Sequence, residues 1–473
     1  MSDRPQDNST DTGRLLDIIM TVSRHKPAQG LTPEKLCDIM RDLGPTFVKL
    51  GQLLSMHPEI LPPEYCRALE ALRTDAKQLV TAQMREIISA EYGRPWNTVF
   101  SRILPFPVGS ASIAQVHEAV LLDGTHVAVK IQRPDIYATM ERDVRLIKKA
   151  LSILKFRTIN AINSVMDIVD IIDEVWRVAK EEMDFEKEAA NIKLLRKNTE
   201  GIEYVYCPKV YEELSTKNVL VMEFIGGFEL NDIEGMKNAG YDMAEVCTKF
   251  INNYIKQFAE DKFFHADPHP GNIRVQDGQI VWLDLGMMGR LSDQDAANFT
   301  RAMHAIFIND VYEFTDAVIE LCHFLEPPDR EAMVDCFRGY LDKYRAVSME
   351  EMTSSSDIFE ELFKISSKFG LSVPRGLTMI WRSLLVMEGT VAMLSPDTNL
   401  AAIIGKHLAA QALGKGLAGT IARSISHKKL MSGTRLSHNG YRPDPDDAGG
   451  DYVDEQSLEE LKAMARAEEA VAR

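Results

Sequence analysis

Apolar residues recur at helical spacing through much of the first hundred residues, and this pattern predicts a helical region from about residue 15 to residue 92. Proline-containing breaks at residues 27–30 and 58–63 divide it into several helices. One predicted helix, over residues 43–55, places Phe47, Leu50 and Leu54 on a single apolar face. On this pattern alone, Lys49 and Gln52 of that helix are interpreted as a surface lysine and a solvated amide.

After residue 100 the pattern changes to strands. Residues 112–122 and 126–131 alternate between apolar and polar positions on either side of Asp123-Gly124, which is a strong turn signal. The second strand contains the tetrapeptide Val-Ala-Val-Lys, whose lysine is Lys130. Further along, apolar residues at helical spacing over residues 168–178 run into an acidic cluster.

The most specific segment is His265-Ala266-Asp267-Pro268-His269-Pro270-Gly271-Asn272. Two short apolar runs follow it, residues 273–276 and 279–283, and the dipeptide Asp277-Gly278 between them predicts a tight hairpin. Asp284 opens an Asp-Leu-Gly turn directly after the hairpin. We therefore expect the octapeptide and Asp284 to lie at one cleft.

This spacing is typical of a kinase-like phosphoryl-transfer site, in which a base aspartate stands five residues before a metal-binding asparagine and a second metal-binding aspartate follows. Asp267, Asn272 and Asp284 occupy these places. Mg²⁺ prefers hard oxygen ligands and bridges nucleotide phosphates, so two oxygen donors on adjacent loops suffice. We predict that Asp267 is catalytic, that Asn272 and Asp284 bind the metal, and that the cofactors are ATP and Mg²⁺.

The earlier strands supply candidates for nucleotide binding. In kinases the Val-Ala-Val-Lys lysine contacts the phosphates and is oriented by a helical carboxylate; Lys130 takes the first role, and both Glu182 and Glu188 remain candidates for the second. The preceding loop has serine and alanine where protein kinases have glycine, so the nucleotide geometry is expected to differ; its predicted nucleotide-binding residues are Gly109, Ser110, Ala111 and Ser112. Residues 219–227 resemble the last small-lobe strand and hinge, with Glu223 beside the adenine, although an ordinary buried strand and turn fits the same residues.

Composition narrows the class of protein. A chain of 473 residues that is 45% hydrophobic can bury a large core, and its formal charge of −16 argues against a nucleic-acid partner. The six cysteines show no Cys-x-x-Cys spacing, so neither a zinc site nor a disulfide framework is expected. The polar start lacks a signal sequence and no apolar run reaches 18 residues, so we expect a cytoplasmic protein without a membrane span.

Taken together, these motifs resemble the ABC1/UbiB family of atypical kinases over roughly residues 31–397. The family's K-x-G-Q motif is matched by Lys49, Gly51 and Gln52, and its E-x-D motif by Glu182 and Asp184. Its alanine-rich loop is matched by residues 109–117 and its catalytic loop by the octapeptide above.

The resemblance implies that Lys49 and Gln52 are active-site residues and that Lys49 faces Glu182. In the family the K-x-G-Q helix lies over the site where a protein kinase would bind its peptide, which disfavours a protein kinase. Leu285 stands where phenylalanine is usual, and this apolar replacement should preserve the packing and leave Asp284 its metal role.

The fold class predicted is α+β, a two-lobed protein-kinase-like fold with a helical N-terminal extension and a mostly helical C-terminal lobe. The expected parts are a disordered lead-in (1–13), the extension with the K-x-G-Q motif (14–100), the small lobe (101–230), the large lobe (231–430), and an acidic linker with a short terminal helix (431–473). Basic segments at residues 142–157 and 423–435 are candidates for peripheral contact with anionic lipid, although a solvated basic face fits them better.

The function predicted is a Mg²⁺-dependent ATPase or small-molecule kinase, with Lys130, Asp267, Lys49, Gln52, Glu182 and Glu188 as its catalytic residues. The resemblance implies a role in isoprenoid quinone (ubiquinone) biosynthesis or lipid homeostasis, with a lipid or quinone precursor as candidate partner. The alternative is a non-catalytic, nucleotide-binding lipid scaffold, for which a lost catalytic residue would be expected, and none is lost. The phosphoryl acceptor and the oligomeric state remain open.

Overall fold

The computed structural model describes residues 11–25, 31–55, 63–70, 72, 79–110, 113–153, 168–324, 326–345, 355–371, 373–398, 400 and 403. Ala111, Ser112, the basic segment 423–435 and the acidic tail lie outside these ranges. The chain forms two compact units, which are described separately: unit 1 comprises residues 1–193 and 208–224, and unit 2 comprises residues 194–207 and 225–473. The predicted domain boundaries stay predictions.

The N-terminal part of unit 1 is helical, as expected. Its helices are α1 (Asp11–Arg24), α2 (Pro33–Leu43), α3 (Pro45–Ser55), α4 (Pro63–Glu70) and α5 (Thr81–Tyr92). Helix α2 starts where the Thr32 side chain accepts a hydrogen bond from the Lys35 N–H, and it stops at Gly44, whose φ of 100° continues no helix. Helix α3 packs against both α2 and α4.

Helix α1 begins earlier than the expected lead-in of residues 1–13 allows. Asp11 stands in its first turn, where a negative charge favours the helix N-terminus, and its carboxylate lies 2.8 Å from Arg145. Residues 1–10 lie outside the described part of the chain. The predicted disordered lead-in is therefore wrong for residues 11–13, which are helical.

A buried ion pair fastens α1 to α6 (Ile136–Ile153). Nε and Nη2 of Arg14 donate to the two carboxylate oxygens of Asp143 at 3.1 and 3.0 Å, and Nη2 also donates to the Leu43 carbonyl at 2.8 Å. The Arg14 guanidinium lies 5.6 Å from the centre of the Phe47 ring of α3. One side chain thus connects three helices of the extension, α1, α2 and α3, with α6.

Unit 1 also contains an antiparallel sheet of five strands. The strands are β1 (Phe100–Ile103), β2 (Gly109–Ser110), β3 (Ala114–Leu121), β4 (His126–Gln132) and β6 (Val219–Glu223), in the order β1-β3-β4-β6 with β2 beside β3. The β3–β4 hairpin and β6 confirm the predicted strands. One face of the sheet forms a hydrophobic core with α5, to which Met84 and Ile88 contribute. Beyond the sheet, α7 (Ile168–Glu182) is followed by α8 (Phe185–Asn198).

Unit 2 holds two small sheets. One has the order β5-β10-β9-β7, formed by β5 (Val205–Tyr206), β10 (Gln279–Trp282), β9 (Ile273–Gln276) and β7 (Phe228–Glu229), and the other pairs β8 (Phe263–His265) with β11 (Met288–Arg290). The β9–β10 hairpin is the predicted one. Asp277 and Gly278 have φ values of 50° and 80°, as a two-residue turn with both central φ angles positive requires.

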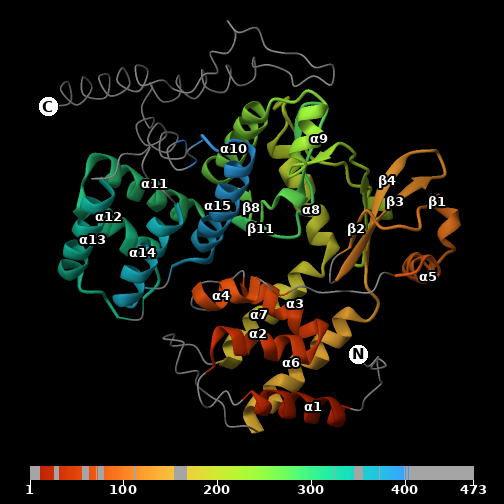
Figure 1. The fold of residues 1–473 in the computed structure, drawn as a ribbon, viewed down its shortest axis with the longest axis horizontal. Helices are drawn as coiled ribbons and strands as arrows, with labels where there is room; N and C mark the ends of the chain where they lie inside the picture. Colours follow the sequence, from red (N-terminus) through yellow and green to blue (C-terminus); the bar gives the residue numbers. More distant parts are fainter. Residues whose placement is uncertain are drawn as a thin grey trace, which may run out of the picture. The chain divides into compact units, whose positions relative to one another are not determined.

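The rest of unit 2 is helical. Short α9 (Ile233–Asn238) precedes α10 (Met243–Ala259), and α11 (Asp293–Ile308), α12 (Val311–Leu321), α13 (Arg330–Arg345), α14 (Ser355–Lys368) and α15 (Arg375–Leu394) follow the sheets. Helices α11 to α14 pack in succession around a core that includes Phe314 and Phe337 (Figure 1). Together with the sheets, these helices confirm a fold of mixed helix and sheet with a mostly helical C-terminal part.

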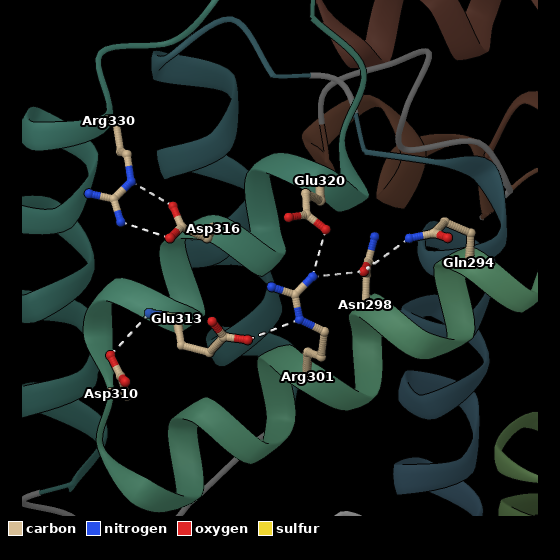
Figure 2. Close-up of polar contacts among 8 residues, drawn as sticks. All are labelled: Gln294, Asn298, Arg301, Asp310, Glu313, Asp316, Glu320 and Arg330. Carbon is tan, nitrogen blue, oxygen red and sulfur yellow. Dashed lines mark hydrogen bonds and ion pairs between the residues drawn. The ribbon is translucent and has the colours of Figure 1, made fainter.

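Ion pairs tie the outer helices together (Figure 2). Arg301 of α11 lies 2.9 Å from Glu313 and 2.6 Å from Glu320 of α12, and Arg330 of α13 makes two hydrogen bonds to Asp316 of α12. Such partly exposed pairs contribute little individually, about 1 kcal/mol or less each. Their main effect is to fix the helices side by side.

Helix α15 packs against α10, α14 and β11 of unit 2. Among the described residues, only its segment Gly376–Leu394 is long and apolar enough to cross a membrane, and 56% of that window is buried inside the structure. A buried core helix meets the same test, so the segment is weak support for a span.

Candidate nucleotide and metal site

Lys130 and Glu188 form a buried ion pair inside unit 1. Strand β4 places Lys130 between Val116 and Leu220 of its neighbouring strands, and the first turns of α8 carry Glu188. The Lys130 Nζ lies 2.9 and 2.8 Å from the two Glu188 carboxylate oxygens, and the residues are only 8% and 2% exposed. Of the two carboxylates left open by the sequence, Glu188 is therefore the partner of Lys130.

Glu182 has a different partner. Its Oε2 lies 2.8 Å from the Lys49 Nζ, so Lys49 of α3 faces the last turn of α7 as the family resemblance implies. The first interpretation of Lys49 as a surface lysine is wrong, because only 15% of its side chain is exposed. The next residue of the E-x-D motif, Asp184, immediately precedes α8, and its carbonyl accepts from the Lys187 N–H at 3.1 Å.

Packing explains the glycine of the K-x-G-Q motif. A Cβ on Gly51 would lie 2.6 Å from Leu72 Cδ1 and 3.4 Å from Leu69 Cδ2, so a larger residue would require the Leu72 side chain to shift. The adjacent Gln52 donates through Nε2 to the Leu72 carbonyl at 2.8 Å. In this conformation Gln52 therefore holds the backbone of Leu72.

The loop expected to contact the phosphates begins in β2. Gly109 and Ser110 pair with Val116 and Gln115 of β3, and a Cβ on Gly109 would make only an ordinary contact, 3.7 Å from Val116 Cβ. The buried Gln115, which sequence reasoning did not single out, accepts from the Leu79 N–H at 3.0 Å and lies 3.5 Å from the Ser110 hydroxyl. A polar residue at a core-facing position of a predicted strand is the pattern that could have identified Gln115. The nucleotide roles of this loop stay predictions.

Glu223 ends β6 immediately before the chain leaves unit 1 at Phe224. Its N–H donates to the Lys209 carbonyl at 2.8 Å, and its carboxylate accepts from the Lys209 N–H at 3.1 Å. These bonds hold the end of the strand in place at the expected hinge. The contact of Glu223 with adenine stays a prediction.

In unit 2, the octapeptide forms a tight loop between β8 and β9. The Asp267 carbonyl accepts from the His269 N–H at 2.7 Å and from Asn272 Nδ2 at 3.2 Å, and the Asn272 N–H donates to the His269 carbonyl at 2.8 Å. His269 Nδ1 accepts from the Gly271 N–H at 3.2 Å. Because its Nδ2 is used inside the loop, Asn272 presents Oδ1 as the atom suited to a metal ion.

The hairpin brings Asp284 to this loop. The Leu283 N–H donates to the Asn272 carbonyl at 2.8 Å, so the residue before Asp284 is bonded directly to the predicted metal ligand Asn272. Asp284 has a φ of 48°, a conformation that is uncommon for residues other than glycine and often marks a functional site. Leu285 is fully buried, in agreement with its expected packing role. Two oxygen donors on adjacent loops fit Mg²⁺.

His265 joins the two loops and does not face solvent. Its Nδ1 accepts from the Asp267 N–H at 3.1 Å and must be unprotonated, so Nε2 carries the proton and donates to the Leu283 carbonyl at 3.3 Å. Burial lowers the pKa of His265, against the opposing effects of the Asp267 and Asp284 carboxylates. A neutral His265 imidazole with these two hydrogen bonds braces the loop.

Together, the β4 lysine with its helical carboxylate and the loop-hairpin-aspartate arrangement define a kinase-like protein. The family model of the ABC1 atypical kinase-like domain matches residues 71–318, and the model of the UbiB helical domain matches residues 337–399. The chain belongs to the ABC1 atypical kinase-like family.

Two relatives agree with this assignment in sequence. An uncharacterized protein of the hydrogenase 1 5′ region of Clostridium pasteurianum is 33% identical over 380 residues, which cover 80% of this chain and 71% of that protein. The probable protein kinase UbiB of Marinobacter nauticus is 30% identical over 369 residues, 76% of this chain and 66% of that protein. The structure of a Mycobacterium tuberculosis protein in complex with erythromycin aligns over 76% of this chain and 90% of its own, with 21% identity and a TM-score of 0.49.

Proposed function

We propose that this protein binds ATP with Mg²⁺ and catalyses phosphoryl transfer to water or to the hydroxyl group of a small molecule. The observation that carries the proposal is the hydrogen bond from Leu283 to Asn272, because it fixes Asp284 beside the loop that holds Asp267 and Asn272. Aspartate and asparagine at this spacing are the residues that phosphoryl transfer needs.

In unit 1, Lys130 would contact the nucleotide phosphates. Its ion pair with Glu188 keeps the ammonium group in one position, which suits a cation that must meet anionic oxygens. The pair is formed within one unit by residues 58 positions apart. Lys130 is therefore preorganised for its proposed role.

In unit 2, Asn272 and Asp284 would hold the metal ion, which when bound supplies positive charge to the phosphates. Asp267 would orient the attacking hydroxyl or accept its proton. The loop fixes the backbone of Asp267, since its N–H donates to His265 and its carbonyl accepts from His269 and Asn272. Catalysis would then rest on positioning and charge rather than on a covalent intermediate.

The proposed acceptor is small because the ion pair of Lys49 with Glu182 builds the K-x-G-Q helix into unit 1. A fixed helix of this kind is not the open groove that a peptide substrate requires. The family resemblance points to isoprenoid quinone synthesis or lipid homeostasis as the setting, with a lipid or quinone precursor as substrate or ligand and peripheral contact with a membrane.

The test is ATP turnover by purified protein with Mg²⁺, measured with and without lipid vesicles and a substituted phenol that mimics a quinone precursor. Asp284→Asn should abolish turnover. Asp277→Asn is the matched control, because Asp277 lies at the turn of the hairpin that precedes Asp284, and its φ of 50° suits asparagine equally well. Nucleotide binding without turnover under any condition would instead support a non-catalytic lipid scaffold.

A further inference from the structure

A stripe of buried polar residues runs along α10, a helix that is otherwise part of the apolar core. Lys249, Asn253 and Gln257 recur every four residues and are 8%, 0% and 0% exposed. A buried amide costs about 1–3 kcal/mol unless its hydrogen bonds are made. The partners of this stripe therefore indicate why unit 2 keeps it.

The bonds of the stripe lead to the β9–β10 hairpin and to β8. The Asn253 Oδ1 accepts from the Trp282 indole N–H at 2.7 Å and from Gln257 Nε2 at 2.9 Å. Gln257 Oε1 accepts from the His265 N–H at 3.0 Å. Lys249 donates to the Gly278 carbonyl at the hairpin turn, 3.3 Å away. One helix face thus holds the hairpin at its turn and at its end.

From His265 the network divides toward both aspartates. The His265 Nδ1 holds the Asp267 N–H, and its Nε2 holds the carbonyl of Leu283, the residue before Asp284. The His265 and Trp282 rings also lie against each other, with centroids 5.4 Å apart. Gln257 is therefore hydrogen-bonded to His265, whose ring is bonded to Asp267 and to Leu283, the residue before Asp284.

We infer that Gln257 and Asn253 are positioning residues for the metal site, holding the catalytic loop and the metal-binding turn of unit 2 as one rigid piece. The inference rests on the proposed function, because it assumes that Asn272 and Asp284 bind a divalent cation. Groups that orient metal ligands typically change metal affinity about 10- to 100-fold when they are replaced. We expect this range for Gln257.

Thr315 offers a matched control. It is fully buried in unit 2, its hydroxyl donates one hydrogen bond to the Val311 carbonyl at 2.7 Å, and it belongs to α12, outside the network. Thr315→Val removes a buried hydrogen bond without touching the metal-binding loops. A variant that merely lowers stability should resemble Thr315→Val.

The experiment measures Mn²⁺ binding by electron paramagnetic resonance, with a non-hydrolysable ATP analogue present, for the wild type, Asp284→Asn, Gln257→Met and Thr315→Val. Nucleotide affinity without metal is measured in parallel. Methionine keeps the length of Gln257 and removes both hydrogen bonds. We expect Gln257→Met to weaken Mn²⁺ binding about tenfold or more, with metal-free nucleotide binding and the Thr315→Val protein unchanged.

The outcomes separate the two claims. If the wild type binds Mn²⁺ through Asp284 and Gln257→Met binds it equally well, the positioning role is overturned and the proposed function stands. If the wild type binds no Mn²⁺, both are overturned. If Gln257→Met fails to fold, Trp282→Phe is measured in its place. Trp282→Phe removes only the indole donor to Asn253 and keeps an aromatic ring beside His265. Unchanged Mn²⁺ affinity in Trp282→Phe would likewise overturn the inference.

Discussion

The buried pair of Lys130 and Glu188 allows a quantitative prediction. Both side chains are almost fully buried, and each carboxylate oxygen lies within 2.9 Å of the ammonium group. Removing one member of such a pair leaves an uncompensated charge in the interior and costs about 3–5 kcal/mol. Replacing both members with apolar residues of similar size is close to neutral or even stabilising. The free energies of unfolding should therefore be strongly non-additive.

We expect Lys130→Met and Glu188→Leu each to lower the free energy of unfolding by about 3–5 kcal/mol, and the double variant to lose less than either. Urea unfolding of the wild type and the three variants, followed by circular dichroism, completes a double-mutant cycle. The pair of Lys49 and Glu182 serves as comparison, since its side chains are 15% and 16% exposed and its coupling should be smaller.

The same cycle separates stability from function. The double variant should be folded yet lack nucleotide turnover, because methionine carries no charge for the phosphates. Single variants that each cost less than about 1 kcal/mol, or costs that simply add, would refute the reasoning from burial.

Three further predictions concern other parts of the chain. Gly289→Ala should lower the free energy of unfolding by about 1–3 kcal/mol, because the alanine Cβ would overlap the Phe264 ring. The loss should appear as a reduced melting temperature. An unchanged melting temperature would contradict the packing of β8 on β11. Arg14→Ala should lower the free energy of unfolding in urea by about 3 kcal/mol or more, because it leaves the buried Asp143 carboxylate without its Arg14 partner. Adding Asp143→Ala to Arg14→Ala should recover part of that loss. Equal losses in the single and the double variant would argue against the ion pair. A thiol reagent at pH 8 should label Cys336 first, because the other five cysteines are buried. Burial also raises the pKa of the Cys207 and Cys322 thiols to about 12, so that their reactive thiolates form only at higher pH. Rapid labelling of several thiols in the folded protein would refute this prediction.

Local signals in the sequence predicted much of the fold. The turn Asp277-Gly278 implied a hairpin because these residues accept positive φ, and both have it. The alternation around Asp123-Gly124 predicted β3 and β4, and Gly124 of this turn has a positive φ of 87°. In such segments the local preference and the tertiary structure agree, so the pattern is sufficient.

Contacts between distant residues could not be predicted in this way. Glu182 and Glu188 belong to one acidic cluster, and only the break between α7 and α8 directs one to Lys49 and the other to Lys130. The pairing of Arg14 with Asp143 spans 129 positions, so no periodicity reveals it. The role of Lys49 came from the family resemblance, since its spacing alone indicated a surface residue.

The most direct test of the central claim is a calorimetric titration of ATP into the wild type and Asp284→Asn, each with and without Mg²⁺. We expect Mg²⁺ to strengthen ATP binding to the wild type markedly, and to have little effect on Asp284→Asn. Equal Mg²⁺ dependence in the two proteins would show that Asp284 holds no metal and would contradict the assignment of the nucleotide and metal site.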